Sequence, residues 1–520
     1  MNFLEKRRPL ILSLIIAAVF KIWLVFSNST TFNGDEAVIA TMARHILQGA
    51  KPVFFYGQEY MGSLDAYLVA GGFAIFGEHV WVIRLVQSVL YLLYIVTLWW
   101  LAKLWFKDSL KPAIVVILAA IPPIVVTTYT TMSLGGYGES LLLGNLILSL
   151  GYLVIYGDKQ FNSKTWIILG LVGGLAFWTL GMAGIYLLPI GLLGLWKFDR
   201  KKIKYYLFAA GSFLIGSLPW WFYNLENEWG AFSTLTGVHI YSSSIFERIQ
   251  SAILFGIPAL LGMRFPWGSE YLPWPLIFVI LILNMGVILF IANRCRKRGV
   301  KDLSNGVTIL LIYTLSCFMI LFLSTYGIDF TGRYLLPLYL PLLFAMASLI
   351  SYLFQKKFIF GWMVIILILG TNLIGSILAA NSVDKFTTQF DPISSFDNSS
   401  DQALIKFLTE KGELRGYSNY WVTFRFAFLT NEEIIFAADL PYKQDLSFNP
   451  LGNRYPRYSE IVDASEKVAF ITTDQPNLNE LIRNKFESLK ISFLETDIGE
   501  FHIFYDLSEA VRPEDIGFSQ

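Results

Sequence analysis

The chain has 520 residues, of which 55% are hydrophobic and 15% are charged, and its formal net charge is +1. Soluble domains carry roughly 25% charged residues, so this composition excludes an ordinary soluble protein, and the near-neutral charge argues against nucleic-acid binding. The mean hydropathy of +0.54 predicts a polytopic α-helical membrane protein.

Eleven apolar segments approach the length of about 20 residues that a helix needs to cross a bilayer. Those between residues 165 and 196 form either two spans or one re-entrant pair, because Gly181 and Gly184 interrupt them. Two further apolar segments, 62–77 and 250–262, are short and are expected at the membrane interface. The predicted spans are 9–27, 80–102, 112–128, 139–156, 165–180, 183–196, 205–221, 273–293, 306–324, 335–354 and 358–380.

Lys and Arg residues gather before the first span and in every second loop after it. Because cytoplasmic loops carry an excess of these residues, the N-terminus is predicted to be cytoplasmic. We therefore expect a multi-pass protein of the plasma (inner) membrane. The predicted extracytoplasmic segments are 28–79, 129–138, 222–272, 325–334 and everything after residue 381.

The composition changes after the last predicted span. We assign residues 1–380 to a transmembrane domain, 381–401 to a linker rich in Ser, Asp and Asn, and 402–520 to a small extracytoplasmic α/β domain. The elements expected in this domain are helices over 402–411 and 476–489, a strand end at 416–421, a buried strand at 468–471 and a hairpin over 491–506.

The first outer loop opens with Asn33-Gly34-Asp35-Glu36. Asn33 can cap a helix, and Glu36 lies three residues on, which is the spacing of a capping box. The helical spacing that follows separates an apolar face from a polar one and ends at Gly49. The apolar face consists of Ile39, Met42, Ala43 and Ile46. The polar face consists of Thr41, Arg44, His45 and Gln48. A short amphipathic helix of this kind lies in the membrane plane.

Two interpretations of Asp35 and Glu36 follow from this placement. Acids in the first turn commonly cap a helix and complement its dipole. Capping needs one acid rather than two, however, and an interfacial carboxylate is costly unless it is solvated or paired. The pattern alone leaves both a capping role and a functional role open.

Two stretches carry a resemblance to a known family. The first runs from Phe32-Asn33-Gly34-Asp35-Glu36 through Phe76-Gly77 to Arg84-Leu85, and the second is Thr331-Gly332-Arg333-Tyr334 with Pro337 and Pro341. They resemble GT-C fold membrane glycosyltransferases, in the branch of the protein O-mannosyltransferases and the lipid A aminoarabinose transferase. The resemblance covers the membrane part, about residues 1–380.

The resemblance implies a hexosyl- or pentosyltransferase that takes its sugar from a polyprenyl phosphate and inverts the anomeric centre. The acceptor would be a glycan, a lipid or a protein on the outer face. Asp35 would accept the proton of the acceptor hydroxyl. Arg333 is the favoured cation for the leaving phosphate, beside Tyr334 as a substrate-binding candidate. Other cations predicted on the outer face are Arg44, Arg84 and Arg264.

One departure from the family pattern concerns the donor. Several members carry a Lys-Pro pair shortly before the segment that matches 62–77, and its lysine meets the donor phosphate. Here that place reads Gln58-Glu59-Tyr60-Met61-Gly62-Ser63-Leu64-Asp65, without a lysine. Another cation must then meet the phosphate, or the donor headgroup is held differently, so the donor stays open.

Four more polar residues are substrate-binding candidates: Glu36, His45, Asp65 and Glu139. His45 lies on the polar face of the interfacial helix, and Asp65 begins an apolar segment in which a charge is expensive. Glu139 either lines the acceptor cavity or only starts the fourth span. Hard oxygen ligands suit magnesium or manganese, so Asp35, Glu36 and Asp65 are candidate ligands of a divalent cation, although a monophosphate leaving group has less need of one.

Two other functions compete with this prediction. A transporter or flippase of lipid-linked sugars would carry charges within its spans, whereas the middle spans here contain almost no acids or bases. A glycan polymerase or ligase would use a diphosphate-linked donor, and the sequence does not separate it from a transferase that uses a monophosphate.

Overall fold

The structure, a computed structural model, describes residues 7–106, 108–232, 243–298, 305–390 and 398–518. The chain divides into two compact units that do not follow the order of the sequence. Unit 1 contains Met1–Ser27, Tyr60–Asp65 and Arg84–Ala380. Unit 2 contains Asn28–Glu59, Ala66–Ile83 and Asn381–Gln520, so the first outer loop belongs mainly to the same unit as the C-terminal domain.

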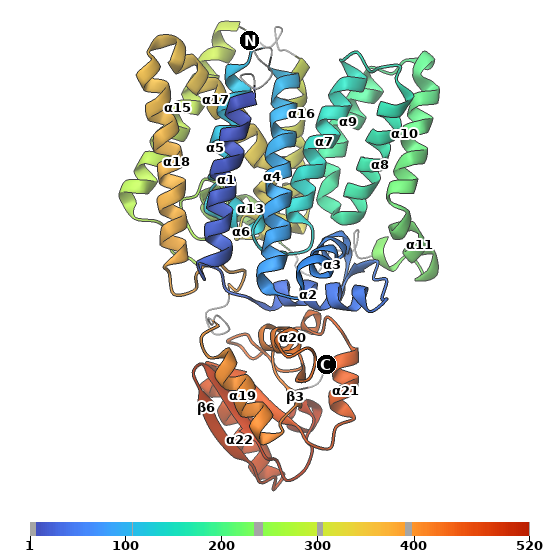
Figure 1. Ribbon diagram of the computed structural model, residues 1–520, viewed down its shortest axis with the longest axis vertical. Helices are drawn as coiled ribbons and strands as arrows, with labels where there is room; N and C mark the ends of the chain where they lie inside the picture. Colours follow the sequence, from blue (N-terminus) through green and yellow to red (C-terminus); the bar gives the residue numbers. More distant parts are fainter. Residues whose placement is uncertain (1–6, 107, 233–242, 299–304, 391–397, 519–520) are drawn as a thin grey trace. The chain divides into compact units, whose positions relative to one another are not determined.

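Unit 1 consists of apolar helices that run alongside one another (Figure 1). In chain order they are α1 (Arg8–Phe26), α4 (Val80–Trp105), α5 (Leu110–Ala119), α6 (Ile124–Tyr129), α7 (Tyr137–Ile155), α8 (Ser163–Thr179), α9 (Gly184–Trp196), α10 (Ile203–Gly216), α11 (Leu218–Glu226), α13 (Ile245–Ser251), α14 (Ile257–Leu260), α15 (Trp274–Arg298), α16 (Asn305–Leu323), α17 (Tyr339–Lys356) and α18 (Phe358–Ala380).

Within the described ranges, seven helical segments are long and apolar enough to cross a membrane. They are α1, α4, α7, α15, α16, the segment Arg333–Lys356 and α18. Large apolar side chains on these segments, such as Ile15, Phe278 and Ile366, are exposed, as lipid contact requires. The polytopic helical class is therefore confirmed, whereas the number of eleven spans stays a prediction.

Three of the predicted spans are interrupted or short. Pro122 and Pro123 separate α5 from α6 within the predicted span 112–128, because proline cannot donate the helical hydrogen bond. The predicted span 205–221 breaks at Ser217, between α10 and α11. Residues 184–196 of the predicted span 183–196 form the 13-residue helix α9, which follows α8 after a single turn at Gly181–Ala183.

Glycines allow the closest helix packing in unit 1. Gly170 and Gly174 of α8 face α10, where an added Cβ would come within 2.1 Å of the main-chain oxygens of Ala209 and Phe213. Small residues four positions apart are typical of helix pairs in membranes, since they let the backbones approach. This spacing explains why α8 and α10 lie side by side.

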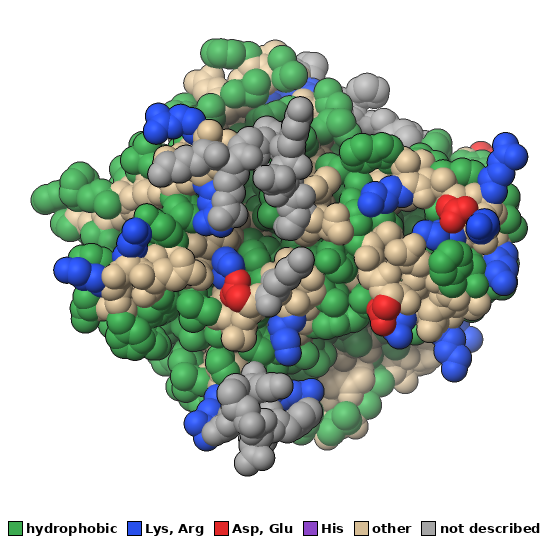
Figure 2. Space-filling view, turned by 90° about the horizontal axis from the view of Figure 1, so that it is seen from above, with side chains coloured by type: hydrophobic (Ala, Val, Ile, Leu, Met, Phe, Trp, Pro, Cys, Tyr) green, Lys and Arg blue, Asp and Glu red, His purple; other side chains and the backbone are tan. Residues whose placement is uncertain are grey.

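Figure 2 shows the end of unit 1 at which the N-terminus of the described chain lies. Lys and Arg side chains are spread over this face, and acidic side chains are fewer. Such a distribution is what the positive-inside rule describes for a cytoplasmic face. The predicted orientation agrees with this distribution and stays a prediction.

Unit 2 contains a five-stranded sheet with helices around it (Figure 1). The strand order is β4-β3-β5-β7-β6, in which β3 is parallel to β4 and β5, and β7 is antiparallel to β5 and β6. The elements are α2 (Gly34–Leu47), β1 (Phe54–Phe55), β2 (Gln58–Gly62), α3 (Leu64–Phe76), α19 (Asp401–Lys411), β3 (Arg415–Tyr417), α20 (Tyr420–Leu429), β4 (Ile435–Ala437), α21 (Arg457–Asp463), β5 (Ala469–Thr473), α22 (Pro476–Ser488), β6 (Leu494–Ile498) and β7 (Phe501–Tyr505), of which β2 and α3 cross the boundary to unit 1.

The strand β5 is the core of this sheet. All five of its residues are buried, as expected for a strand covered on both faces. Phe470 of β5 pairs in register with Phe504 of β7, and Phe486 of α22 packs against both rings. The small α/β domain predicted from the sequence is confirmed, and its two predicted helices and its buried strand lie within two residues of their expected bounds. The hairpin begins three residues later than predicted, at Leu494, and the predicted strand end 416–421 is wrong beyond Tyr417, because α20 begins at Tyr420.

The predicted linker is ordered over its first residues. Phe386 is 1% exposed, and residues 384–388 run parallel to residues 29–31, with hydrogen bonds from Thr31 N to Phe386 O and from Phe386 N to Ser29 O. Residues 391–397 of the predicted linker lie outside the described residues. The chain that leaves α18 is therefore held against the start of the first outer loop.

The helix α2 forms where the sequence predicts it. The Asn33 side chain accepts a hydrogen bond from Glu36 N at 3.1 Å, as the capping pattern requires. Its polar face, however, is not turned to water, since Thr41, Arg44 and His45 are 0%, 4% and 8% exposed. The helix packs against α20, so both of its faces are covered.

Candidate active site

Asp35 lies in the first turn of α2 and is half-buried. Tyr420 Oη donates a hydrogen bond to Asp35 Oδ1 at 2.6 Å, and Thr388 Oγ1 donates one to Oδ2 at 3.0 Å. Thr388 in turn accepts a hydrogen bond from Asn33 Nδ2 at 2.8 Å. Both oxygens of the carboxylate are thus oriented by residues from distant parts of the sequence.

The absence of a side chain at Gly34 lets Tyr420 come this close. A Cβ at position 34 would lie 3.1 Å from Tyr420 Cε1 and from its main-chain oxygen, and 3.3 Å from Trp421 Cε3. Tyr420 itself begins α20, which is capped by the Asn419 side chain. The first turns of α2 and α20 therefore meet at Asp35.

Arg454 is the cation next to Tyr420. Its Cζ lies 5.4 Å from the centroid of the Tyr420 ring. In the orientation of the Gln58 amide that satisfies both of its polar atoms, Arg454 Nη1 and Nη2 each donate to Gln58 Oε1 at 2.6 Å. Burial, and next the Asp35 carboxylate, raise the pKa of Tyr420 well above its ordinary value, so Tyr420 remains a donor. We call Asp35, Gln58, Thr388, Tyr420 and Arg454 the Asp35 cluster.

Glu36 and His45 are both buried side chains of α2. The main-chain nitrogen of Glu36 donates the hydrogen bond with which Asn33 caps α2. His45 uses both ring nitrogens: Nδ1 lies 2.9 Å from Tyr56 Oη, and Nε2 lies 3.1 Å from Glu432 Oε1. These contacts favour a role for His45 in holding α2 rather than in binding substrate.

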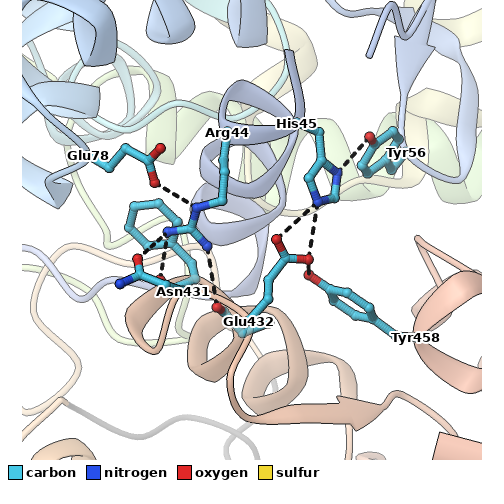
Figure 3. A network of polar contacts seen from close by, with 9 residues as sticks. Arg44, His45, Tyr56, Glu78, Asn431, Glu432 and Tyr458 are labelled. Atoms are coloured by element: carbon cyan, nitrogen blue, oxygen red, sulfur yellow. Dashed lines mark hydrogen bonds and ion pairs between the residues drawn. The ribbon is translucent and has the colours of Figure 1, made fainter. Parts of the chain in front are cut away.

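Figure 3 shows the network that His45 shares with its neighbour Arg44. Arg44 Nε pairs with Glu78 at 2.6 Å, and Nη2 donates to Phe428 O and to Asn431 Oδ1, both at 3.0 Å. The carbonyl of Phe428 lies at the C-terminal end of α20, where a cation satisfies unpaired carbonyls and the helix dipole. Arg44 therefore fastens α2 to α20, and its charge is already neutralised.

A second polar group lies in unit 1 around Asp65. The buried Asp65 accepts hydrogen bonds from Gln87 Nε2 at 2.8 Å, Ser133 Oγ at 2.7 Å and Gly135 N at 3.0 Å. Gln87 Nε2 also donates to Glu139 Oε1 at 3.0 Å. The structure thus brings together two predicted site residues, Asp65 and Glu139, through a glutamine that the sequence pattern did not identify.

Arg333 belongs to unit 1 and begins the segment that leads into α17. Its Nη2 pairs with Asp329 Oδ2 at 2.9 Å, and its Cζ lies 4.9 Å from the Tyr334 ring centroid. Tyr334 packs against Tyr326, with 4.6 Å between ring centroids. Arg264, another predicted outer-face cation, is buried and donates to Phe330 O at 2.7 Å. Arg264 therefore supports the loop that carries Arg333.

The predicted metal ligands are the carboxylates of Asp35, Glu36 and Asp65. Among the residues that the structure describes, no group of three or more His, Cys, Asp or Glu side chains could hold a metal ion. The divalent-cation site at Asp35, Glu36 and Asp65 therefore stays a prediction, and we derive no step through a metal.

Sequence reasoning missed Thr388, Tyr420 and Arg454 of the Asp35 cluster. Tyr420 carried a signal, because it follows a helix-capping asparagine in the conspicuous aromatic run over residues 417–428. Thr388 and Arg454 carried none, since each lies in an irregular segment with ordinary neighbours. Only the fold brings them to Asp35.

Comparison with known proteins identifies the fold. Residues 63–223, less than half of the chain, match the family model of the dolichyl-phosphate-mannose-protein mannosyltransferases. No curated protein matches the sequence. The crystal structure of ArnT from Cupriavidus metallidurans in the apo state is similar to this chain, with a TM-score of 0.61 and 11% sequence identity over 94% of this chain and 97% of ArnT.

The protein has the GT-C fold. A second crystal structure of the same ArnT, bound to undecaprenyl phosphate, has a TM-score of 0.57 and 12% identity over 96% of this chain and 98% of that chain. The GT-C assignment confirms the predicted fold class, including the C-terminal sheet domain. At such low identity the comparison shows the fold alone, so the roles of individual residues rest on their geometry.

Proposed function

We propose that this GT-C protein is a glycosyltransferase that transfers a sugar from a polyprenyl-phosphate donor to a hydroxyl group of an acceptor. The observation that carries the proposal is the Asp35 carboxylate, held through both oxygens at the start of α2, with Arg454 next to the tyrosine that binds it. The GT-C fold, the match of residues 63–223 and the undecaprenyl phosphate bound by ArnT support this donor class.

In the proposed reaction the acceptor oxygen attacks the anomeric carbon while Asp35 accepts its proton. The new carbon–oxygen bond forms as the bond between the anomeric carbon and the phosphate oxygen breaks. The electron pair of that bond leaves with the phosphate, which yields polyprenyl phosphate. Attack from the side opposite the leaving group inverts the anomeric centre.

The contacts of Asp35 suit the role of a base. An ionised carboxylate has about four acceptor positions, and Tyr420 and Thr388 occupy one on each oxygen. These donors fix the orientation of the carboxylate and leave a further position on each oxygen for the acceptor hydroxyl. Such fixed orientation is what positioning contributes to catalysis.

The remaining predicted residues take supporting roles in this proposal. His45 holds α2, and Glu36 stays a predicted substrate-binding residue. Asp65 and Glu139, linked through Gln87, are proposed to bind sugar or acceptor hydroxyls. Arg333, with Tyr334 beside it, stays a predicted partner of the phosphate. To bind the phosphate, Arg333 would have to break its ion pair with Asp329 or contact both anions at once.

The decisive experiment compares wild-type protein with the Asp35→Asn variant on a panel of polyprenyl-phosphate sugars. We expect transfer to fall by about 10²-fold to 10⁴-fold, the usual contribution of a general base. Asp445→Asn is the matched control, because Asp445 is an exposed carboxylate of the same unit. Full activity of Asp35→Asn would reject the base, and a wild-type protein inactive on every donor would reject the donor class.

A further inference from the structure

Arg454 differs from the other covered arginines of unit 2 in its partners. Arg44 pairs with Glu78, and Arg425 pairs with Asp401. Within the described ranges Arg454 forms no ion pair with a carboxylate, and its buried Nε has no hydrogen-bond partner. A half-buried charge without a counter-ion is costly, so this position is suited to an anionic ligand.

The neighbours of Arg454 hold its guanidinium in place without neutralising it. The neutral amide of Gln58 accepts from both terminal nitrogens at 2.6 Å, and Gly57 O lies 3.4 Å from Nη1. The rings of Tyr420 and Phe55 lie 5.4 and 5.9 Å from Cζ. A rigid, charged group of this kind can recognise phosphate with little further ordering.

One side chain separates Arg454 from Asp35. Tyr420 donates its hydroxyl hydrogen bond to the Asp35 carboxylate and presents its ring to the guanidinium. The first turns of α2 and α20 meet at the same place, and helix N-termini favour a negative charge. A base for the acceptor and a cation for the leaving group are thus connected through a single side chain.

We infer that Arg454 binds the phosphate group of the lipid-linked donor at the Asp35 cluster. The inference rests on the proposed function for the identity of the donor. It assigns to the C-terminal domain a direct contact with substrate, in addition to the contacts that hold α2. Arg333 has its own counter-ion in Asp329, whereas the charge of Arg454 is available to the phosphate.

The test measures binding of polyprenyl phosphate, the expected product, to the purified full-length protein, because binding needs no sugar transfer. We expect Arg454→Gln to weaken binding by about 10-fold to 100-fold, the usual effect of losing a charged hydrogen bond. Arg454→Lys should retain part of the affinity. Arg457→Gln, which changes an exposed arginine of α21, should bind like the wild type.

Kinetics provide the second measurement. In Arg454→Gln the KM for the donor should rise while the KM for the acceptor stays unchanged, a separation that general misfolding would not produce. Gln58→Leu keeps the charge but removes its support, so it should weaken lipid binding less than Arg454→Gln. This variant keeps the inference testable if Arg454→Gln does not fold.

Several outcomes would overturn the inference. Wild-type affinity in Arg454→Gln, with binding lost in Arg333→Gln, would move the phosphate contact to unit 1. If Arg454→Gln loses affinity for inorganic phosphate but binds polyprenyl phosphate like the wild type, the lipid is excluded as the ligand of Arg454. If the wild type binds polyprenyl phosphate but transfers no sugar, the proposed function fails, and the binding data alone decide the role of Arg454.

Discussion

The hydrogen bond between Tyr420 and Asp35 has a defined place in the proposed mechanism. Tyr420→Phe keeps the ring that covers Arg454 and removes only the donor. Hydrogen bonds to charged groups contribute about 1.5–3 kcal/mol, so we expect kcat to fall by about 10-fold or more with little change in the KM for the donor. Steady-state kinetics check this expectation, and Tyr505→Phe, on β7, is the control. An unchanged kcat would reject the positioning role.

Gly34 tests how closely α2 and α20 must approach. In Gly34→Ala the new Cβ would meet the ring and the main-chain oxygen of Tyr420 at 3.1 Å, and overpacking typically costs about 1–3 kcal/mol. We therefore expect a lower Tm and lower activity. Gly71→Ala on α3 is the matched control, because a Cβ there meets nothing within 4 Å and alanine favours a helix. Equal stability of the two variants would contradict the prediction.

The contact between α2 and α20 should depend on pH through Glu432. Burial raises the pKa of Glu432, but hydrogen bonds from His45 and Tyr458 outweigh burial and hold its pKa below the ordinary value of 4.5. A lowered pKa in the folded state contributes stability above the ordinary value, and this stability is lost as the pH falls through the folded value.

Thermal unfolding at a series of pH values checks this contribution. We expect the Tm of the wild type to drop below about pH 4.5. Glu432→Gln should have a lower Tm at neutral pH and a smaller drop on acidification, because the amide does not titrate. The exposed Glu460 of α21 provides the control Glu460→Gln. A drop of equal size in Glu432→Gln would assign the acid sensitivity to other groups.

At the scale of the helices and strands, local sequence patterns predicted where helices form better than they predicted which residues pack against them. The capping residue Asn33 and the helical spacing after it located α2 correctly. They did not show that Arg44 and His45 are buried, because their partners Phe428 and Glu432 lie far along the chain. Hydropathy likewise predicted one continuous span across Pro122 and Pro123, because an apolar stretch remains apolar where its helix is interrupted.

At the scale of the whole molecule, composition was sufficient for the polytopic helical class, and the resemblance carried by residues 32–85 and 331–341 was needed for the GT-C fold. The interleaved units were not predictable in this way: residues 28–59 join residues 381–520 in unit 2 through contacts such as Thr30 with Phe386 and Asp35 with Tyr420. The sequence therefore identified Asp35 as a candidate base. It could not identify the residues that orient it, because only the folded chain places them there.

The predicted orientation can be tested with the two natural cysteines. Cys295 is exposed near the end of α15 between Arg294 and Arg296, whereas Cys317 is buried. The basic residues around Cys295 predict a cytoplasmic position. A membrane-impermeant maleimide should therefore label Cys295 in inside-out vesicles and not in right-side-out vesicles.

A cysteine introduced at Ser488, an exposed position at the end of α22, should show the opposite pattern in a Cys295→Ser background. Cys317 should stay unlabelled in both preparations until the protein is denatured, which makes it an internal control. Labelling of Cys295 in right-side-out vesicles would contradict its predicted cytoplasmic position. Labelling of the Ser488→Cys variant only in inside-out vesicles would place Asp35 and Arg454, which share a unit with Ser488, on the cytoplasmic side, where a donor would have to be loaded from the inner leaflet.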